Sequence, residues 1–356
     1  MKNIYLQLHD HKLDNPSLVL CTVTRTHGST PQKPGSSAIF DNNGLIAGTV
    51  GGGVVEGKVQ RLAIEAYKSK SSGHFQFNLS NDISNKEEAI CGGQIEILID
   101  ASLNNHFPVF EQIRKSIKDH VPGVLLTKVT GLPEEKVLIN RYWISNTFKP
   151  DMPVEFLEKI EPVIQNMLSK GDPSDYREME LSITNAEATT LFFLEPVFPP
   201  AHLVIAGAGH IGKALAHLAN LLDFEVTVID DRPEYANAEN IPEADHILVN
   251  DIGESIKGLM KNKDTYVVIV THGHKDDAAA LKPCIGADLA YTGMIGSKTK
   301  IASMRASFME NKWATAKQWD AIHAPLGIDI KSGTVEEIAI SIAAELVLVR
   351  NGRRSK

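Results

Sequence analysis

The chain has 356 residues, a hydrophobic content of 43% and a formal net charge of -8. This length suffices for two domains, or three, with a sizeable buried core. The acidic balance argues against a nucleic-acid partner, which would require a basic face, and the lack of an apolar run of about 20 residues argues against a membrane-spanning helix.

The cysteines and the N-terminal residues indicate the cellular compartment in which the protein is expected. Cys21, Cys91 and Cys284 lie far apart and form neither a disulfide framework nor a CxxC metal motif. The first 14 residues mix charged and polar side chains and lack the apolar run of a signal peptide. We therefore expect a cytoplasmic protein in a reducing environment.

The first half of the chain is rich in expected strands. Apolar or alternating runs typical of strands occupy 17–24, 37–40, 45–47 and 94–99, followed by weaker patterns at 123–130, 136–141 and 189–195. Asn43 and Gly44 separate two of these runs and are typical of a hairpin turn. Helices are expected at 56–69 and 107–118. The pattern predicts a strand-rich α+β N-terminal domain that covers residues 1–195.

A proline-rich segment at 196–200 interrupts regular structure and marks the domain boundary. Beyond it, expected strands at 201–205, 224–231, 244–249, 265–270 and 290–294 alternate with expected helices at 213–222, 252–261, 278–283, 298–309, 317–320 and 335–349. Such alternation indicates a parallel sheet covered by helices on both faces. The fold class is therefore α/β, with a Rossmann-like doubly wound parallel sheet in residues 196–356.

A glycine-rich turn follows the first strand of this second domain. Gly207, Gly209 and Gly212 form a GxGxxG pattern that includes His210 and leads into a helix. The next strand ends in Asp230 and Asp231. Such a turn brings backbone close to a ligand's phosphates at a helix N-terminus, and the acid is placed to bind a ribose. The alternative to ligand binding is that these glycines serve only the packing of the helix against the strand.

Two later loops carry histidines. His272, His274 and Asp277 follow the strand at 265–270, where the ligand crevice of a doubly wound sheet is expected. These side chains could bind a metal, donate hydrogen bonds to an anion, or lie in solvent. His323 lies on an irregular turn before the last helix. The alternative to a binding role is that this turn only connects the chain to that helix.

The N-terminal domain has glycine loops of its own. Gly51, Gly52 and Gly53 lead into the helix that contains Glu56, so the N–H groups of that turn can receive an anion. Cys91 lies beside two glycines and is either a reactive thiol or a small buried apolar residue.

These motifs together resemble the XdhC/CoxI family, the xanthine dehydrogenase accessory proteins. The resemblance rests on the order and spacing of the segments 28–35, 48–56, 91–93, 207–212, 230–233, 271–274, 293–297 and 322–327. The stretch from about 104 to 195 adds little to it.

The resemblance implies a chaperone of the molybdenum cofactor rather than a turnover enzyme. Such a protein would bind molybdopterin, support its sulfuration by a cysteine desulfurase and insert it into a xanthine dehydrogenase-type molybdoenzyme, acting as a homodimer. The candidate cofactor-binding residues are Gly51, Gly52, Gly53, Glu56, Cys91, Gly207, Gly209, His210, Gly212, Asp230, Asp231, His272, His274 and His323. Cys91 is the candidate contact to the cofactor's molybdenum.

Two other functions are compatible with the residues. An NAD(P)-dependent oxidoreductase would place the GxGxxG turn on a pyrophosphate and Asp230 on a ribose. A metal-dependent hydrolase would use His272, His274 and Asp277 as ligands.

Overall fold

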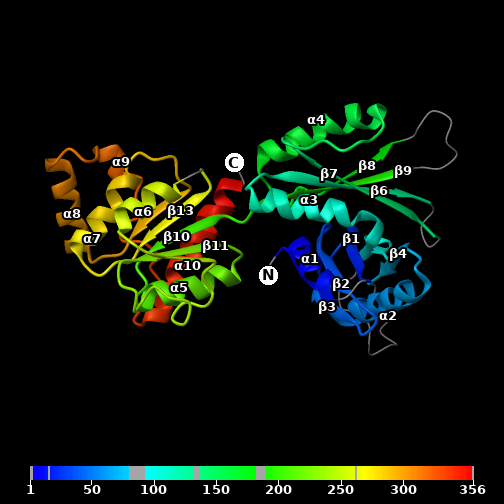
Figure 1. Cartoon of the computed structure of the whole chain (residues 1–356), viewed down its shortest axis with the longest axis horizontal. Coiled ribbons are helices and arrows are strands. Elements are labelled where there is room, and N and C mark those ends of the chain that lie inside the picture. Colours follow the sequence, from blue (N-terminus) through cyan, green and yellow to red (C-terminus); the bar gives the residue numbers. More distant parts are fainter. Residues whose placement is uncertain are drawn as a thin grey trace. The chain divides into compact units, whose positions relative to one another are not determined.

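The computed structural model describes residues 3–14, 17–79, 93–131, 136–181, 190–260 and 263–354 (Figure 1). The chain divides into two compact units, Met1–Pro199 and Pro200–Lys356. The division falls inside the proline-rich segment in which the sequence places a domain boundary. The fold is mixed α/β, with antiparallel sheets in the first unit and a parallel sheet in the second, as the sequence predicts.

The first unit begins with a five-stranded antiparallel sheet of order β3-β2-β1-β5-β4. Its strands are β1 (Val19–His27), β2 (Ser37–Phe40), β3 (Leu45–Gly48), β4 (Gly73–Asn78) and β5 (Gln94–Asp100). Helix α2 (Gly53–Ser69) buries Val55, Val59 and Ala63 against one face of the sheet. The i, i+4 spacing of these residues produces the apolar stripe that such packing requires.

The second sheet of this unit has the order β7-β6-β9-β8 and is also antiparallel. It consists of β6 (Gly123–Thr130), β7 (Leu138–Ser145), β8 (Arg177–Leu181) and β9 (Thr190–Val197). Helix α4 (Val154–Lys170) packs Phe156, Ile160 and Ile164 on it. A separate apolar cluster joins α1 (Ile4–Asp14), the four-residue 3-10 turn η1 (Leu103–His106) and α3 (Phe107–Lys118) to both sheets.

Among the helices and strands that the structure describes in the first unit, α1, β4, α4 and β8 have no counterpart in the sequence prediction, and neither has the 3-10 turn η1. Helix α4 contains Pro162, which removes a backbone hydrogen bond and makes the segment look irregular. Strand β8 has only 5 residues, two of them glutamates, so its apolar signal is short.

The second unit is a five-stranded parallel sheet of order β12-β11-β10-β13-β14. Its strands are β10 (His202–Ala206), β11 (Glu225–Asp230), β12 (His246–Val249), β13 (Thr265–Ile269) and β14 (Tyr291–Met294). The chain starts in the middle of the sheet, builds one side as β11 and β12, and then crosses to β13. The strand order therefore reverses between β10 and β13, which is the switch point of a Rossmann-like sheet.

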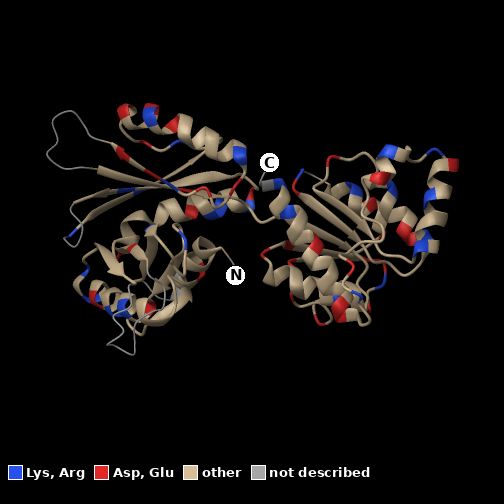
Figure 2. Cartoon of the chain, turned by 180° about the vertical axis from the view of Figure 1, so that it is seen from behind, with Lys and Arg blue, Asp and Glu red and all other residues tan. Residues whose placement is uncertain are grey.

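Helices cover both faces of the parallel sheet. On one face lie α5 (His210–Leu221) and α10 (Val335–Arg354). On the other lie α6 (Ile252–Leu259), α7 (His274–Leu281) and α8 (Lys298–Glu310), with the short η2 (Lys282–Cys284) and α9 (Ala316–Asp320). Lys, Arg, Asp and Glu residues lie mainly on helices and loops, while the strands of this sheet contain few of them (Figure 2). No helix in the described parts of the chain combines the length and apolar character needed to cross a bilayer.

One buried ion pair links the two sheets of the first unit. The guanidinium of Arg141 on β7 donates from Nε to Asp100 Oδ2 at 3.0 Å and from Nη1 to Thr127 Oγ1 at 3.0 Å. Asp100 ends β5, and both side chains are almost fully buried, with 2% and 0% exposed. A buried charge of this kind is tolerated only while its partner is present.

Replacement of the acid in this pair tests that constraint. We expect Asp100→Asn to lower the free energy of unfolding by about 3 to 5 kcal/mol, because it removes the carboxylate that is paired with the buried Arg141 charge. Glu161→Gln removes the partner of Lys149 in an exposed pair and should cost less than about 1 kcal/mol. Urea denaturation of both variants measures the difference, and equal costs would contradict a structural role for the pair.

Candidate functional site

The three glycines of the turn after β10 have different reasons to be glycine. Gly207 has φ +116°, and a Cβ there would lie 2.5 Å from the carbonyl oxygen of Val270. A Cβ on Gly212 would lie 1.9 Å from the carbonyl oxygen of Gly207. Nothing lies within 4 Å of the Cβ position of Gly209. The protein's own packing therefore requires the first and third glycines, and the second leaves open space at the start of α5.

Asp230, the candidate ribose-binding acid, is engaged with the protein itself. Its carboxylate accepts hydrogen bonds from the Ala208 amide at 2.8 Å and from the Arg232 amide, Nε and Nη2 at 3.1, 2.9 and 2.9 Å. Burial raises the pKa of Asp230, but these hydrogen bonds outweigh it and hold the pKa below its usual value. Four hydrogen bonds fill the acceptor positions of a carboxylate. Asp230 therefore anchors the glycine turn, whereas the neighbouring Asp231 is exposed.

Helix N-termini at the switch point lack side-chain caps. Helix α5 follows β10 with Gly209 as its N-cap, and α7 follows β13 with Gly273 as its N-cap; neither has a side-chain cap. By contrast, Asp251 caps α6 and Ser297 caps α8. The first N–H groups of a helix need an acceptor, and the dipole there favours an anion. The two open N-termini flank the position at which doubly wound sheets bind ligands.

The loop after β13 places its two histidines in solvent. His272 and His274 are exposed, whereas Asp277 is fully buried. The Asp277 carboxylate accepts a hydrogen bond from Thr271 Oγ1 at 2.6 Å and pairs with Lys300. Asp277 thus fixes the loop to the start of α8. Within the described ranges, no group of three or more His, Cys, Asp or Glu side chains is placed to hold a metal ion.

His323 lies at the edge of the sheet, where it forms a parallel bridge with Gly293 of β14. Its Nδ1 lies 2.9 Å from Glu345 Oε1 on α10. Glu345 and Tyr291, which complete this cluster, were not candidates from the sequence. Their only signals were an acid within the apolar last helix and a tyrosine at the start of a strand.

The glycine loops of the first unit converge at one end of its first sheet. A Cβ on Gly51 would lie 3.0 Å from the Pro31 ring, and one on Gly93 would lie 2.4 Å from the Ser29 carbonyl oxygen. Gly52 caps α2 without a side-chain hydrogen bond, and both Gly52 and Gly53 face open space. Glu56 accepts a hydrogen bond from Thr49 Oγ1 at 2.7 Å and so closes the loop onto the helix.

The two thiols that the structure describes are both buried. Cys21 and Cys284 are free, and burial raises the pKa of each, that of Cys284 to about 12. Neither is therefore a thiolate at neutral pH. Cys91, the candidate contact to molybdenum, lies outside the described residues.

Comparison with known families agrees with this geometry. A model described as the XdhC Rossmann domain matches residues 203–346, and a model of the XdhC and CoxI family matches residues 14–78. The chain belongs to the XdhC and CoxI family. The resemblance found in the sequence motifs is thereby confirmed, and the matches support an accessory role of the XdhC type for xanthine dehydrogenase.

One curated relative and one solved structure match nearly the whole of this XdhC-family chain, and another relative matches part of it. A protein of Bacillus subtilis described as a probable xanthine dehydrogenase subunit is 24% identical over 352 residues, which is 98% of each chain. An uncharacterized protein, YqeB, of Escherichia coli is 33% identical over 150 residues, 42% of this chain and 27% of its own. A crystal structure described as a xanthine dehydrogenase from Bacillus halodurans superposes with a TM-score of 0.76 at 22% identity, covering 98% and 96% of the two chains, and it shows that the fold is shared.

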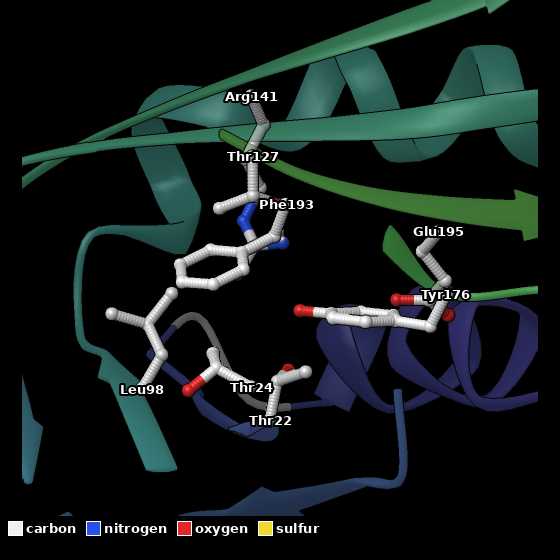
Figure 3. Close-up of a pocket in the computed structure, with 8 residues that line it drawn as sticks. All are labelled: Thr22, Thr24, Leu98, Thr127, Arg141, Tyr176, Phe193 and Glu195. Carbon is white, nitrogen blue, oxygen red and sulfur yellow. Dashed lines mark hydrogen bonds between the residues drawn. The ribbon is translucent and has the colours of Figure 1, made fainter. Parts of the chain in front are cut away.

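A small polar pocket lies between the two sheets of the first unit of this XdhC-family chain (Figure 3). It encloses about 10 Å³, enough for one water-sized molecule. The guanidinium nitrogens of Arg141 and the hydroxyl of Tyr176 point into it (Figure 3). Among the described residues, Arg141 Nη2 has no hydrogen-bond partner. Glu195 lines the same pocket and accepts a hydrogen bond from Tyr5 Oη at 2.7 Å.

The protonation of Glu195 links this pocket to pH. Burial raises the pKa of Glu195 to about 7, although the Tyr5 hydrogen bond and the Arg141 charge both lower it. Because the folded pKa exceeds that of the unfolded chain, the folded state binds the proton more tightly. The resulting stability is fully present below the unfolded pKa and is lost as the pH rises toward 7 and above.

We therefore expect Glu195→Gln, which stays uncharged, to gain stability over the wild type as the pH rises. The difference in unfolding free energy should change by on the order of 3 kcal/mol in favour of the variant between pH 4 and pH 8. Urea denaturation of both proteins across this range measures it. A difference that is independent of pH would show that the carboxyl group keeps an ordinary pKa.

Proposed function

We propose that this XdhC-family protein binds the molybdenum cofactor as cargo, protects it and delivers it to a xanthine dehydrogenase-type molybdoenzyme. Sulfuration by a cysteine desulfurase and action as a homodimer belong to the same proposal and follow from the family resemblance. Molybdopterin carries a phosphate, a flat hydrogen-bonding pterin and a dithiolene, so a site for it must include a place for a phosphate.

The observation that carries the proposal is the open space at Gly209. This glycine is not required by backbone strain or packing, since its φ is -71° and no atom lies within 4 Å of its Cβ position. It is the N-cap of α5, whose first N–H groups have no side-chain cap. Such a helix N-terminus binds anions, and a phosphate is one of them.

The arrangement around Asp230 favours this cargo over NAD(P). A dinucleotide would use the acid at the end of β11 to bind its ribose hydroxyls. Asp230 holds Ala208 and Arg232 instead, and it is 2% exposed. A ligand that needs the turn for its phosphate but has no ribose at that position fits the residues present.

Gly209→Val tests the phosphate role. Since the added side chain enters open space, we expect the variant to fold, with a loss of about 1 kcal/mol because valine is a poor N-cap residue. It should retain at least about tenfold less molybdopterin, because charge-assisted hydrogen bonds to the phosphate are lost. The measurement is co-purification with molybdopterin-loaded extract, followed by fluorescence of the oxidised pterin.

Gly258→Val is the matched control. Gly258 is exposed and, like Gly209, has no atom within 4 Å of its Cβ position, but it lies at the C-terminal end of α6, away from the switch point. This variant should retain the cofactor like the wild type. Unchanged retention by Gly209→Val would end the proposed phosphate role, and saturable micromolar binding of NADH, followed by its fluorescence, would favour the oxidoreductase instead.

A further inference from the structure

A second polar cluster, away from the glycine turn, joins β14, the turn at 322–327 and α10. At its centre is Glu345. Its Oε2 accepts hydrogen bonds from Tyr291 Oη at 2.6 Å and from the Gly327 amide at 2.7 Å, and its Oε1 lies 2.9 Å from His323 Nδ1. The carboxylate is therefore held by three groups, one from β14 and two from the turn at 322–327.

These contacts determine which imidazole nitrogen carries the proton. The Gly327 peptide N–H can only donate, so Glu345 Oε2 is an acceptor. An ionised carboxylate can only accept, so Nδ1 of His323 must carry a hydrogen to bond Oε1. Partial burial raises the pKa of Glu345, but the hydrogen bonds from His323, Tyr291 and Gly327 outweigh it, and the pKa lies below its usual value. The neutral imidazole is thus the Nδ1–H tautomer, and its Nε2 presents a lone pair.

The imidazole is held firmly yet remains accessible. Its ring lies against the ring of Tyr291, with centroids 4.4 Å apart, and the side chain is 37% exposed. Within the described part of the chain, no hydrogen bond or ion pair is formed by Nε2. A carboxylate behind a histidine, with the other nitrogen facing outward, is the arrangement that prepares an imidazole to accept a proton or bind a ligand.

Two glycines leave the space that this cluster occupies. The ring of Tyr291 lies over Gly293, where a Cβ would be 2.4 Å from the tyrosine oxygen. Gly327 has φ +94°, and a Cβ there would be 2.4 Å from Ser341 Oγ, which itself donates to the Ile328 carbonyl oxygen at 2.6 Å. The family motifs at 293–297 and 322–327 therefore meet to orient one histidine.

The position of His323 relative to the glycine turn follows from the pairing of the strands. It is in register with Gly293, which pairs with Val268 and, through it, with Ile205. Its backbone is thus three strand positions from β10, about 14 Å at ~4.8 Å per strand. One residue further along the chain, the backbone reaches the carboxyl edge of the parallel sheet, where the ligand crevice is expected.

We propose that His323 is a ligand-binding residue whose Nε2 accepts a hydrogen bond from a ring N–H of a planar heterocycle, the pterin of the cargo. An oxyanion would need a donor there, and a metal ion would need further ligands that the described residues do not supply. The assignment of the ring to a pterin rests on the proposed function; the tautomer and the role of Glu345 do not.

The tautomer is tested by nitrogen-15 NMR of the imidazole at pH 8. His323 should carry its proton on Nδ1 in the wild-type chain. In Glu345→Gln the side-chain oxygen stays with the Tyr291 and Gly327 donors, so the amide NH₂ faces Nδ1 and should move the proton to Nε2, as amide replacement does in a Ser-His-Asp triad. A wild-type His323 with its proton on Nε2 would overturn the proposal.

The binding step uses pterin and inorganic phosphate as separate probes. Glu345→Gln should bind pterin about tenfold more weakly, because one acceptor has become a donor, while its phosphate binding stays that of the wild type. His217→Gln is the matched control, since His217 also pairs with a glutamate, Glu243, at 2.9 Å, but with 57% of the histidine side chain exposed on α5. It should leave pterin binding unchanged.

The outcomes separate this inference from the proposed function. Equal pterin affinity in the wild type and Glu345→Gln, or no saturable pterin binding by the wild type, would remove His323 from the site even if molybdopterin were retained through Gly209. Failure to retain molybdopterin, together with pterin binding that depends on Glu345, would reject the cofactor while keeping His323 as a heterocycle-binding residue.

Discussion

The close approach of the α5 backbone to the end of β10 is the constraint on which the second unit depends. Gly212 leaves no room for a side chain above the Gly207 carbonyl oxygen, and Asp230 ties the Ala208 amide to the neighbouring strand. Together they hold the first turn of α5 directly over the sheet edge. Helix α5 then shares its apolar face with α10, through residues such as Leu215 and Leu346.

That packing connects the glycine turn to the histidine cluster. Helix α10 is positioned by its contact with α5, and it carries Glu345 to Tyr291 and His323. The fold thus presents two polar features from one layer of helices: an uncapped helix N-terminus suited to an anion and an imidazole acceptor suited to an N–H group. The two features lie on the side of the sheet that α5 and α10 cover.

The second unit was largely predictable because parallel strands are buried on both faces and therefore appear as continuous β-branched runs. The strand at 265–270 is such a run, and β13 occupies most of it. The chemistry of the site was less predictable. Nothing in the sequence indicates that Asp230 is hydrogen-bonded to Arg232, or that His323 is hydrogen-bonded to a glutamate 22 positions later. Both contacts depend on the directions that the side chains take once the elements have packed.

The first unit was harder to derive from the sequence. Strand β1 pairs with β2 nearby but also with β5, far along the chain, and only tertiary structure selects that neighbour. The pairing of Arg141 with Asp100 spans 41 positions and has no local signal. Helix α4 forms around Pro162 because its apolar stripe packs on the second sheet, so burial there prevails over local propensity.

The freedom of Gly209 has a consequence for change in this fold. At Gly207 and Gly212 a larger residue would disturb the backbone itself, so selection for folding alone maintains them. At Gly209 no atom lies within 4 Å of the Cβ position, so only the proposed ligand would set a steric limit there. This single position could therefore exchange one ligand for another, or abandon ligand binding altogether, while the rest of the unit remains folded as before.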